Sequence, residues 1–126
     1  PLNFQLNQPW GLAVNESNQI LFVSDLENNR ILKFNLSSNF VETIVGISRN
    51  QGFKGDGFVA LNASLFNPTF LLISKNGNLF ISDSRNDRIR VLYFNEINEN
   101  LNDSFAISTE TNSNQITFFP STSSTT

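Results

Sequence analysis

The chain has 126 residues, of which 39% are hydrophobic, and a formal net charge of −3. The acidic balance disfavours broad attraction to nucleic-acid phosphates, which requires clustered Lys and Arg. The sequence contains no Cys and no His, which excludes disulfides, thiolate chemistry and histidine as a general base or zinc ligand.

Residues 1–50 are expected to form a first unit of four strands. The strands are predicted from short apolar runs and from alternation of apolar and polar residues, at 12–14, 20–23, 30–34 and 41–45. Asp25 ends the second of these strands, and Arg30 begins the third. No stretch with a helical period competes with this assignment.

Residues 51–67 are expected to cross from the first unit to a second. The glycines in Gly52-Phe-Lys-Gly-Asp-Gly57 indicate turns, and the apolar residues at positions 60, 61, 63 and 65 are predicted to anchor the crossing to the next sheet. Asp56 stands alone between Gly55 and Gly57, without the several carboxylates that calcium requires or the Gly-Lys-Ser/Thr of a phosphate loop. The motif is therefore interpreted as a tight turn.

Residues 68–110 repeat the strand pattern. Strands are predicted at 70–73, 79–81, 88–94 and, from a weaker pattern, 105–108. Asn76-Gly77 is a hairpin signal, because both central positions of a tight two-residue turn need positive φ. Asp83 ends the second strand, and Arg88 begins the third. The Ser/Thr-rich remainder, residues 111–126, is expected to be a disordered polar tail.

The two units are copies of one another. Aligned from Pro9 and Pro68, they share Phe-(Val/Ile)-Ser-Asp followed by Asn and Arg-Ile. A repeated unit cannot bury its apolar face alone, so the repeat predicts stacked sheets. Four strands joined by short turns make an antiparallel meander, which predicts an all-β fold with two four-stranded antiparallel propeller blades. Such blades come about four to eight to a ring, so further blades from a parent chain or self-association are expected.

The repeated unit resembles the NHL repeat of β-propellers. The resemblance is carried by Pro-x-Gly-Leu-Ala-Val, a turn, Leu-Phe-(Val/Ile)-Ser-Asp and Asn-x-Arg-Ile. The resemblance spans residues 6–94, and the crossing is similar to the segment that joins repeats in one NHL subgroup. Phe70 departs from the pattern, because the family usually has Gly there. The resemblance implies an incomplete NHL-type propeller but no single activity. NHL domains include RNA binders, protein binders and sensor ectodomains, and related propellers include metal-dependent enzymes.

The two carboxylates that end strands, Asp25 and Asp83, are interpreted as structural. Such a carboxylate accepts backbone N–H groups two or three residues on, and it can pair with the Arg that begins the next strand. Asn28 and Asn86 are expected to support the same loops, because Asn tolerates left-handed φ. The predicted structural residues are Asp25, Arg30, Gly55, Gly57, Asn76, Gly77, Asp83 and Arg88.

Chain direction reverses at every turn of a meander, so the loop after the second strand and the crossing after the fourth emerge at the same end of the sheet. Loops on a rigid scaffold usually carry binding residues. This end is therefore predicted to be an interaction surface for a protein or another macromolecule. The candidate residues are Glu27, Asn28, Asn29, Lys54, Asp56, Arg85, Asn86 and Asp87.

RNA binding is a first alternative, although nearby acids would neutralise much of the basic charge that it needs. The basic patch would comprise Arg30, Lys33, Arg85, Arg88 and Arg90, with Trp10 or Tyr93 stacking on bases. Trp10 is otherwise expected to pack at a blade edge.

A metal-dependent lactonase- or lyase-like propeller is a second alternative. It would need convergent acids, Asn or His from several blades. The sequence offers no such constellation, so no catalytic residue, metal or cofactor is predicted. No apolar run approaches the roughly 18 residues of a membrane span.

Overall fold

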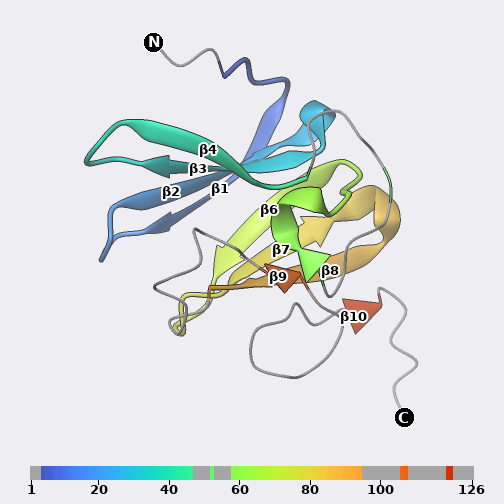
Figure 1. The fold of residues 1–126 in the computed structure, drawn as a ribbon. Helices are drawn as coiled ribbons and strands as arrows, with labels where there is room; N and C mark the ends of the chain where they lie inside the picture. The colour runs from blue at the N-terminus through green and yellow to red at the C-terminus, as the bar shows by residue number, and fades with distance from the viewer. Residues whose placement is uncertain (1–3, 47–51, 53–57, 95–105, 108–118, 121–126) are drawn as a thin grey trace.

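The fold is described from a computed structural model of the chain, for residues 4–46, 52, 58–94, 106–107 and 119–120. The first sheet is antiparallel, with its strands side by side in chain order (Figure 1). It consists of β1 (Pro9–Asn15), β2 (Ile20–Asp25), β3 (Arg30–Asn35) and β4 (Phe40–Val45). The predicted four-stranded meander is confirmed for this half of the chain.

The second sheet repeats this order with β6 (Pro68–Ile73), β7 (Leu79–Asp83), β8 (Arg88–Tyr93) and β9 (Ala106–Ile107). β9 confirms the fourth strand that the weaker pattern predicted. Two short strands were not predicted: β5 (Phe58–Val59) pairs with β9, and β10 (Phe119–Pro120) pairs with β8. β10 falls within the range expected to be a disordered tail, which corrects that expectation for these two residues. The rest of the tail lies outside the described residues.

The two sheets share their local geometry as well as their strand order. In both, the pairing of the first two strands shifts register just after the proline that begins the first. In both, the second strand leads into one 3₁₀ turn, η1 (Leu26–Asn28) or η3 (Ser84–Asn86). Asn29 and Asp87 close these turns in the left-handed conformation, each with φ of 53°. Asn and Asp adopt this conformation more readily than other non-glycine residues.

The hairpin predicted at Asn76-Gly77 joins β6 to β7, but its turn differs from the predicted one. Only Gly77 of this pair has positive φ, at 84°. The Gly77 N–H donates to the Ser74 carbonyl oxygen (2.9 Å), and the Asn78 N–H donates to the Ser74 hydroxyl (3.1 Å). The turn is therefore longer than two residues, and Asn76 needs no left-handed conformation.

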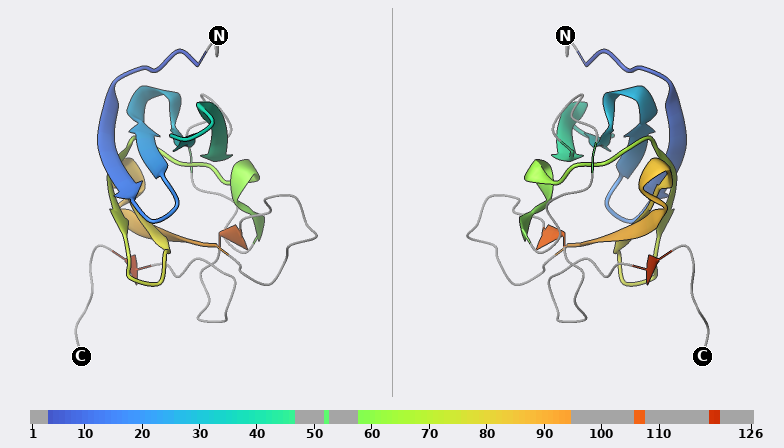
Figure 2. Two further views of the ribbon diagram at one scale, coloured as in Figure 1. Left: turned by 90° about the vertical axis from the view of Figure 1, so that its left-hand side faces the viewer. Right: turned by 90° about the vertical axis from the view of Figure 1, so that its right-hand side faces the viewer.

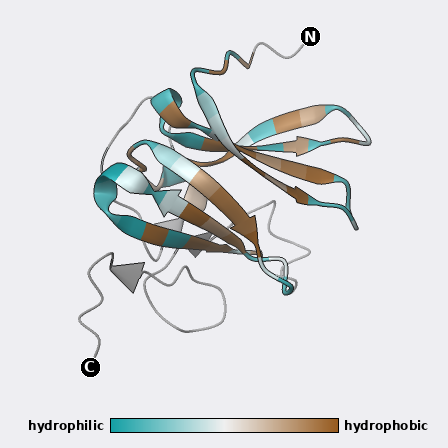
Figure 3. Ribbon diagram, turned by 180° about the vertical axis from the view of Figure 1, so that it is seen from behind, coloured by the Kyte–Doolittle hydropathy of each residue, from teal (hydrophilic) through white to brown (hydrophobic). Residues whose placement is uncertain are grey.

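The main core combines residues of both sheets, and Figure 2 shows the two sheets next to one another. Ile20, Phe22 and Ile44 enter it from the first sheet, and Leu79 and Ile81 enter it from the second. The crossing adds three fully buried residues, as predicted. They are Ala60 in η2 (Ala60–Asn62), Ala63 and Leu65. Leu61 is 47% exposed and does not anchor the crossing, which corrects the prediction. Apolar residues follow the strands of both sheets, whereas the turns are hydrophilic (Figure 3).

The sheets approach one another most closely where β1 meets β6. The Ser24 hydroxyl accepts the N–H of Gly11 (2.6 Å) and donates to the carbonyl oxygen of Thr69 (2.5 Å), so it joins three strands. A Cβ atom on Gly11 would lie 2.0 Å from that same carbonyl oxygen. Glycine is therefore required at position 11, because any side chain would push the sheets apart.

Candidate functional site

A buried carboxylate fixes the turn between β2 and β3. Asp25 is fully buried, and its Oδ1 accepts the backbone N–H of Asn7 (2.7 Å). Its Oδ2 accepts the Asn28 amide (2.8 Å) and the Nε–H of Arg30 (2.7 Å). The predicted pairing with Arg30 is confirmed. The predicted backbone donor was wrong, because the N–H group comes from the segment before β1 and not from the turn itself. Asp25 thus ties this segment to the turn.

Asp83 holds the corresponding turn of the second sheet. Its Oδ1 accepts the N–H of Phe66 (2.7 Å), and its Oδ2 accepts the Asn86 amide (2.8 Å) and Nη1 of Arg90 (2.9 Å). As with Asp25, the backbone donor comes from the segment just before the strand that begins the four-stranded meander, here β6. The cluster therefore repeats the Asp25 cluster, with one exchange of residue.

The exchange concerns the arginine. Arg88 matches Arg30 in sequence and was the expected partner of Asp83, but the salt bridge is formed by Arg90. Arg88 and Arg90 are two apart on β8 and share one face of the sheet. Nη1 of Arg90 also donates to the carbonyl oxygen of Ser64 (3.1 Å), and its side chain is fully buried. The crossing thus supplies the second acceptor that favours Arg90.

Burial raises the pKa of Asp83 above its usual 3.8. The hydrogen bonds from Asn86 and Phe66, together with the guanidinium charge of Arg90, act in the opposite direction. The effect of burial on the pKa is larger than the opposing effect of these partners, because a buried carboxylate loses the hydration that stabilises its charge. Burial therefore dominates the electrostatics of Asp83, and its charged form carries an energetic penalty.

The predicted meeting of loops at one end of the sheets is borne out for the part that the structure describes. The Asn67 N–H donates to Oδ1 of Asn29 (2.8 Å), and its side-chain amide donates to Glu27 (3.3 Å). The Arg85 N–H donates to the Phe66 carbonyl oxygen (3.0 Å). These bonds bring together residues 26–29, 66–67 and 84–87, a surface called here the polar end. Lys54, Gly55, Asp56 and Gly57 lie outside the described residues.

The polar end divides into accessible and buried candidates. Glu27, Arg85 and Asp87 are exposed, and the Arg85 guanidinium lies 5.6 Å from the centre of the Phe66 ring. Asn28 and Asn29, also predicted to contact a partner, are only 5% and 6% exposed, because their amides hold the loops in place. They belong to the scaffold, which corrects the prediction for both.

Asn86 is half-buried, and its amide donates to the carbonyl oxygen of Gly52 (2.6 Å) as well as to Asp83. Asn67 was missed, although it has positive φ (51°) and links the two sheets at this end. Its position next to Pro68 gave no sign of this role. Its partners lie 38 and 40 residues earlier in the chain.

The residues of the alternative RNA patch are largely engaged elsewhere. Within the described residues, salt bridges join Arg30 to Asp25, Lys33 to Glu42, and Arg90 to Asp83. Tyr93 is half-buried against the core. Trp10 is 58% exposed, so its packing at a blade edge stays a prediction.

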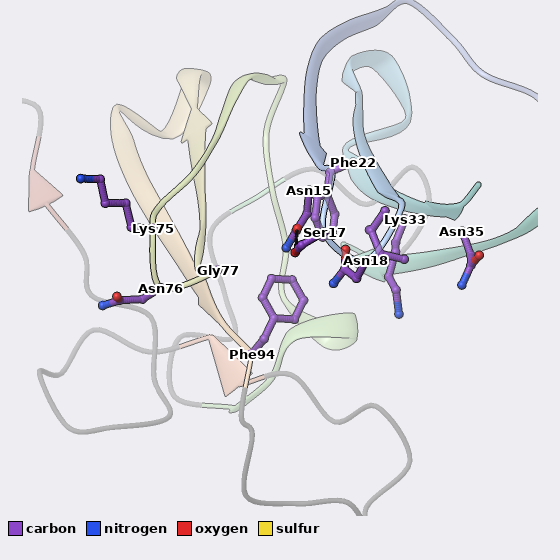
Figure 4. A pocket seen from close by; sticks show the side chains of 11 residues that line it. Asn15, Ser17, Asn18, Phe22, Lys33, Asn35, Lys75, Asn76, Gly77 and Phe94 are labelled. Carbon is purple, nitrogen blue, oxygen red and sulfur yellow. Dashed lines mark hydrogen bonds between the residues drawn. The ribbon is translucent and has the colours of Figure 1, made fainter. Parts of the chain in front are cut away.

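A cleft of about 620 Å³ opens between the sheets at the end opposite to the polar end (Figure 4). Asn15, Asn18 and Lys33 face it from the first sheet, and the rings of Phe22 and Phe94 lie 5.6 Å apart within it. Lys75 and Asn76 stand on its far rim, with their side chains turned away from the other lining residues (Figure 4). The lining combines amides and rings with ammonium groups and has no carboxylate among the described residues.

Within the described ranges, no three side chains of His, Cys, Asp and Glu gather in a way that could hold a metal ion. The described part of the chain also has no helix that is long and apolar enough to cross a membrane.

Comparison with known proteins agrees with this architecture. Residues 6–34 match the model of the NHL repeat. Over 91 residues, or 72% of its length, the chain is 35% identical to Protein SUPPRESSOR OF QUENCHING 1, chloroplastic, of Arabidopsis thaliana. The chain spans 8% of that relative. The duplicated sheets, their shared turn geometry and the matched repeat place this chain in the NHL-repeat β-propeller family, with two blades of an incomplete propeller.

Proposed function

We propose that the chain is a noncatalytic propeller module that binds a protein partner through its polar end. The observation that carries the proposal is the placement of Glu27, Arg85 and Asp87. All three are exposed, and all three stand on turns held by the buried Asp25 and Asp83 clusters. Side chains on fixed turns lose little freedom on binding, which favours recognition.

The charges of the polar end favour a protein over a nucleic acid. Two acids and one exposed arginine present both signs within one surface. A protein surface can match such a mixture, whereas a phosphate backbone would be repelled by Glu27 and Asp87. The salt bridges of Arg30, Lys33 and Arg90 further reduce the cationic charge that RNA would require.

The state of the two conspicuous carboxylates supports a noncatalytic role. Asp25 and Asp83 are fully buried, and both oxygens of each accept hydrogen bonds from the scaffold. A general base must reach a substrate proton, and neither carboxylate is accessible for that purpose. Their position favours a role in fixing the turns that carry the proposed contacts.

Charge reversal at the two ends of the module tests the proposal. The polar-end variant combines Glu27→Lys, Arg85→Glu and Asp87→Lys. The control variant combines Glu16→Lys and Lys75→Glu, which alter exposed residues at the opposite end. Proteins retained by each immobilised variant from one extract are quantified by mass spectrometry, and candidate partners are then measured in purified form. We expect the polar-end variant to lose affinity for a specific partner while the control variant keeps it. If both variants retain the same partner proteins equally, the proposal is contradicted. If both variants still bind purified RNA, the RNA-binding surface lies elsewhere than the polar end.

A further inference from the structure

The outward faces of the two blades carry rows of exposed apolar side chains. On β1, Trp10, Leu12 and Val14 are 58%, 65% and 50% exposed, and on β6, Phe70 and Leu72 are 67% and 66% exposed. Alternate residues of a strand share one face. Single exposed apolar residues are common, but contiguous rows mark interaction surfaces.

The internal junction determines where these rows point. Gly11 abuts the carbonyl oxygen of Thr69, and Ala13 packs on the shared core. Trp10, Leu12 and Val14 alternate with these two residues along β1, so they point away from the second blade. On β6, Leu71 and Ile73 pack on the same core. Phe70 and Leu72 therefore point away from the first blade, beside a groove of about 230 Å³ that Phe80 and Ile89 also line. One open face lies at each end of the two-blade stack.

The repeat provides a template for what could cover these faces. Aligned from the prolines, Gly11 corresponds to Phe70, and Trp10 corresponds to Thr69. At the internal junction, Gly11 of the first blade meets Thr69 of the second. A second copy can stack on the β6 side in the same orientation, so that its β1 meets β6 of the first copy in the way that β6 meets β1 within one chain. Trp10 of the second copy then takes the role that Thr69 has at the internal junction, and it lies opposite Phe70 of the first copy.

The two junctions differ in the size of the residues that meet. Between the blades of one chain, the missing Cβ of Gly11 admits the Thr69 backbone, at 2.0 Å from the Cβ position. Phe70 cannot admit a backbone so closely, because its ring occupies that space. A junction at Phe70 must be wider, and a large side chain on the opposing strand is needed to fill it. Trp10 is such a side chain, and offset or edge-to-face contact between two aromatic rings is favourable.

We propose that copies of this chain associate head to tail, with Trp10 of one copy packed on Phe70 of the next and Leu12 directed toward the groove beside it. Two different surfaces meet in this contact, so the association is heterologous, and further copies add until the stack closes into a ring or extends as a filament. The contact uses the outward blade faces and leaves the polar end accessible. It is therefore independent of the proposed function.

The chain provides its own probe, because Trp10 is its only tryptophan. Sedimentation velocity and tryptophan emission are measured on the 126-residue chain over a concentration series. We expect the mass to rise with concentration and the emission to shift to shorter wavelength in parallel. Phe70→Ser is expected to abolish both changes. Leu61→Ser, which removes an exposed apolar residue from η2, is the matched control and is expected to keep both.

Mixing two variants separates head-to-tail association from symmetric pairing. Trp10→Ser keeps the Phe70 face, and Phe70→Ser keeps the Trp10 face. Each alone is expected to remain monomeric with an unchanged circular dichroism spectrum, while their mixture forms a heterodimer that grows no further. A wild-type chain that stays monomeric at every concentration overturns the proposal. So does a Phe70→Ser variant that still self-associates, or a mixture of folded variants that forms no heterodimer.

Discussion

The hydroxyl of Ser24 lies 2.5 Å from the carbonyl oxygen of Thr69, and this contact connects β2 of one blade to β6 of the next. The same hydroxyl accepts the Gly11 N–H, which is buried between the blades. One small side chain therefore satisfies two backbone groups at the point where the sheets lie closest. The junction depends on this contact and on the absence of a side chain at position 11.

Both residues at this junction are expected to be sensitive to small substitutions. Ser24→Ala leaves the buried Gly11 N–H without its acceptor, which costs about 1–3 kcal/mol. Gly11→Ala places a Cβ against the Thr69 backbone and forces the blades apart, at a cost of about 1–3 kcal/mol. Urea unfolding curves of each variant measure the change. Ser38→Ala, at an exposed position in the β3–β4 turn, is the control and is expected to change stability little. Unchanged midpoints in both junction variants would refute this account.

Alignment of the two repeats makes Arg88 the partner of Asp83, whereas in the structure the partner is Arg90. The two assignments predict opposite rankings of the stability losses at these two arginines. Arg90→Met leaves the buried Asp83 charge without its salt bridge, which typically costs about 3–5 kcal/mol. Arg88→Met, at the position that matches Arg30, is expected to cost considerably less. The free energies of unfolding of the two variants decide the matter. A larger loss for Arg88→Met would mean that Arg88 is the true partner.

The raised pKa of Asp83 predicts a pH dependence of stability. Between the unfolded pKa, near 3.8, and the higher folded pKa, the folded chain holds more protons than the unfolded chain. The contribution of Asp83 to stability is therefore fully present below this window and is lost as pH rises through it. Asp83→Asn has no such titration. The stability of the wild-type chain relative to this variant is thus expected to fall as pH rises above about 3.8.

Urea midpoints of both chains across this pH range measure the effect, and the carboxyl carbon resonance of Asp83 reports its titration directly. An Asp83 midpoint below 3.8, or a wild-type advantage that grows with pH in this window, contradicts the assignment.

Much of the fold could be predicted from the sequence because its signals are local. Apolar runs and alternation identify the long strands, and the reversal of direction at each turn places residues 26–29 and 84–87 at one end. The repeat then supplies the architecture, since copies of one sheet must stack to bury their faces. β5 and β10 carry no such signal, because two residues cannot show an alternating pattern.

The corrections within the candidate site arise from contacts between distant segments. Arg90 is selected by the carbonyl group of Ser64 in the crossing, which no pattern around Asp83 reveals. Asn28 and Asn29 look like exposed loop residues, but they bond to Gln5 and Asn67, respectively. Their burial is a property of the assembled blades, and local sequence cannot report it.

Two glycines with nearly equal φ allow backbone conformation to be separated from close packing. Gly46 and Gly77 have φ of 85° and 84°, so alanine at either position is strained by about 1–2 kcal/mol. A Cβ on Gly77 meets nothing within 4 Å, whereas a Cβ on Gly46 would lie 2.3 Å from the carbonyl oxygen of Asn29. Gly46→Ala is therefore expected to cost clearly more than Gly77→Ala, because it also displaces the β2–β3 turn. Urea unfolding of the two variants measures the difference, and amide chemical shifts of residues 26–29 should move only in Gly46→Ala. Equal losses of stability would indicate that conformation alone accounts for glycine at both positions.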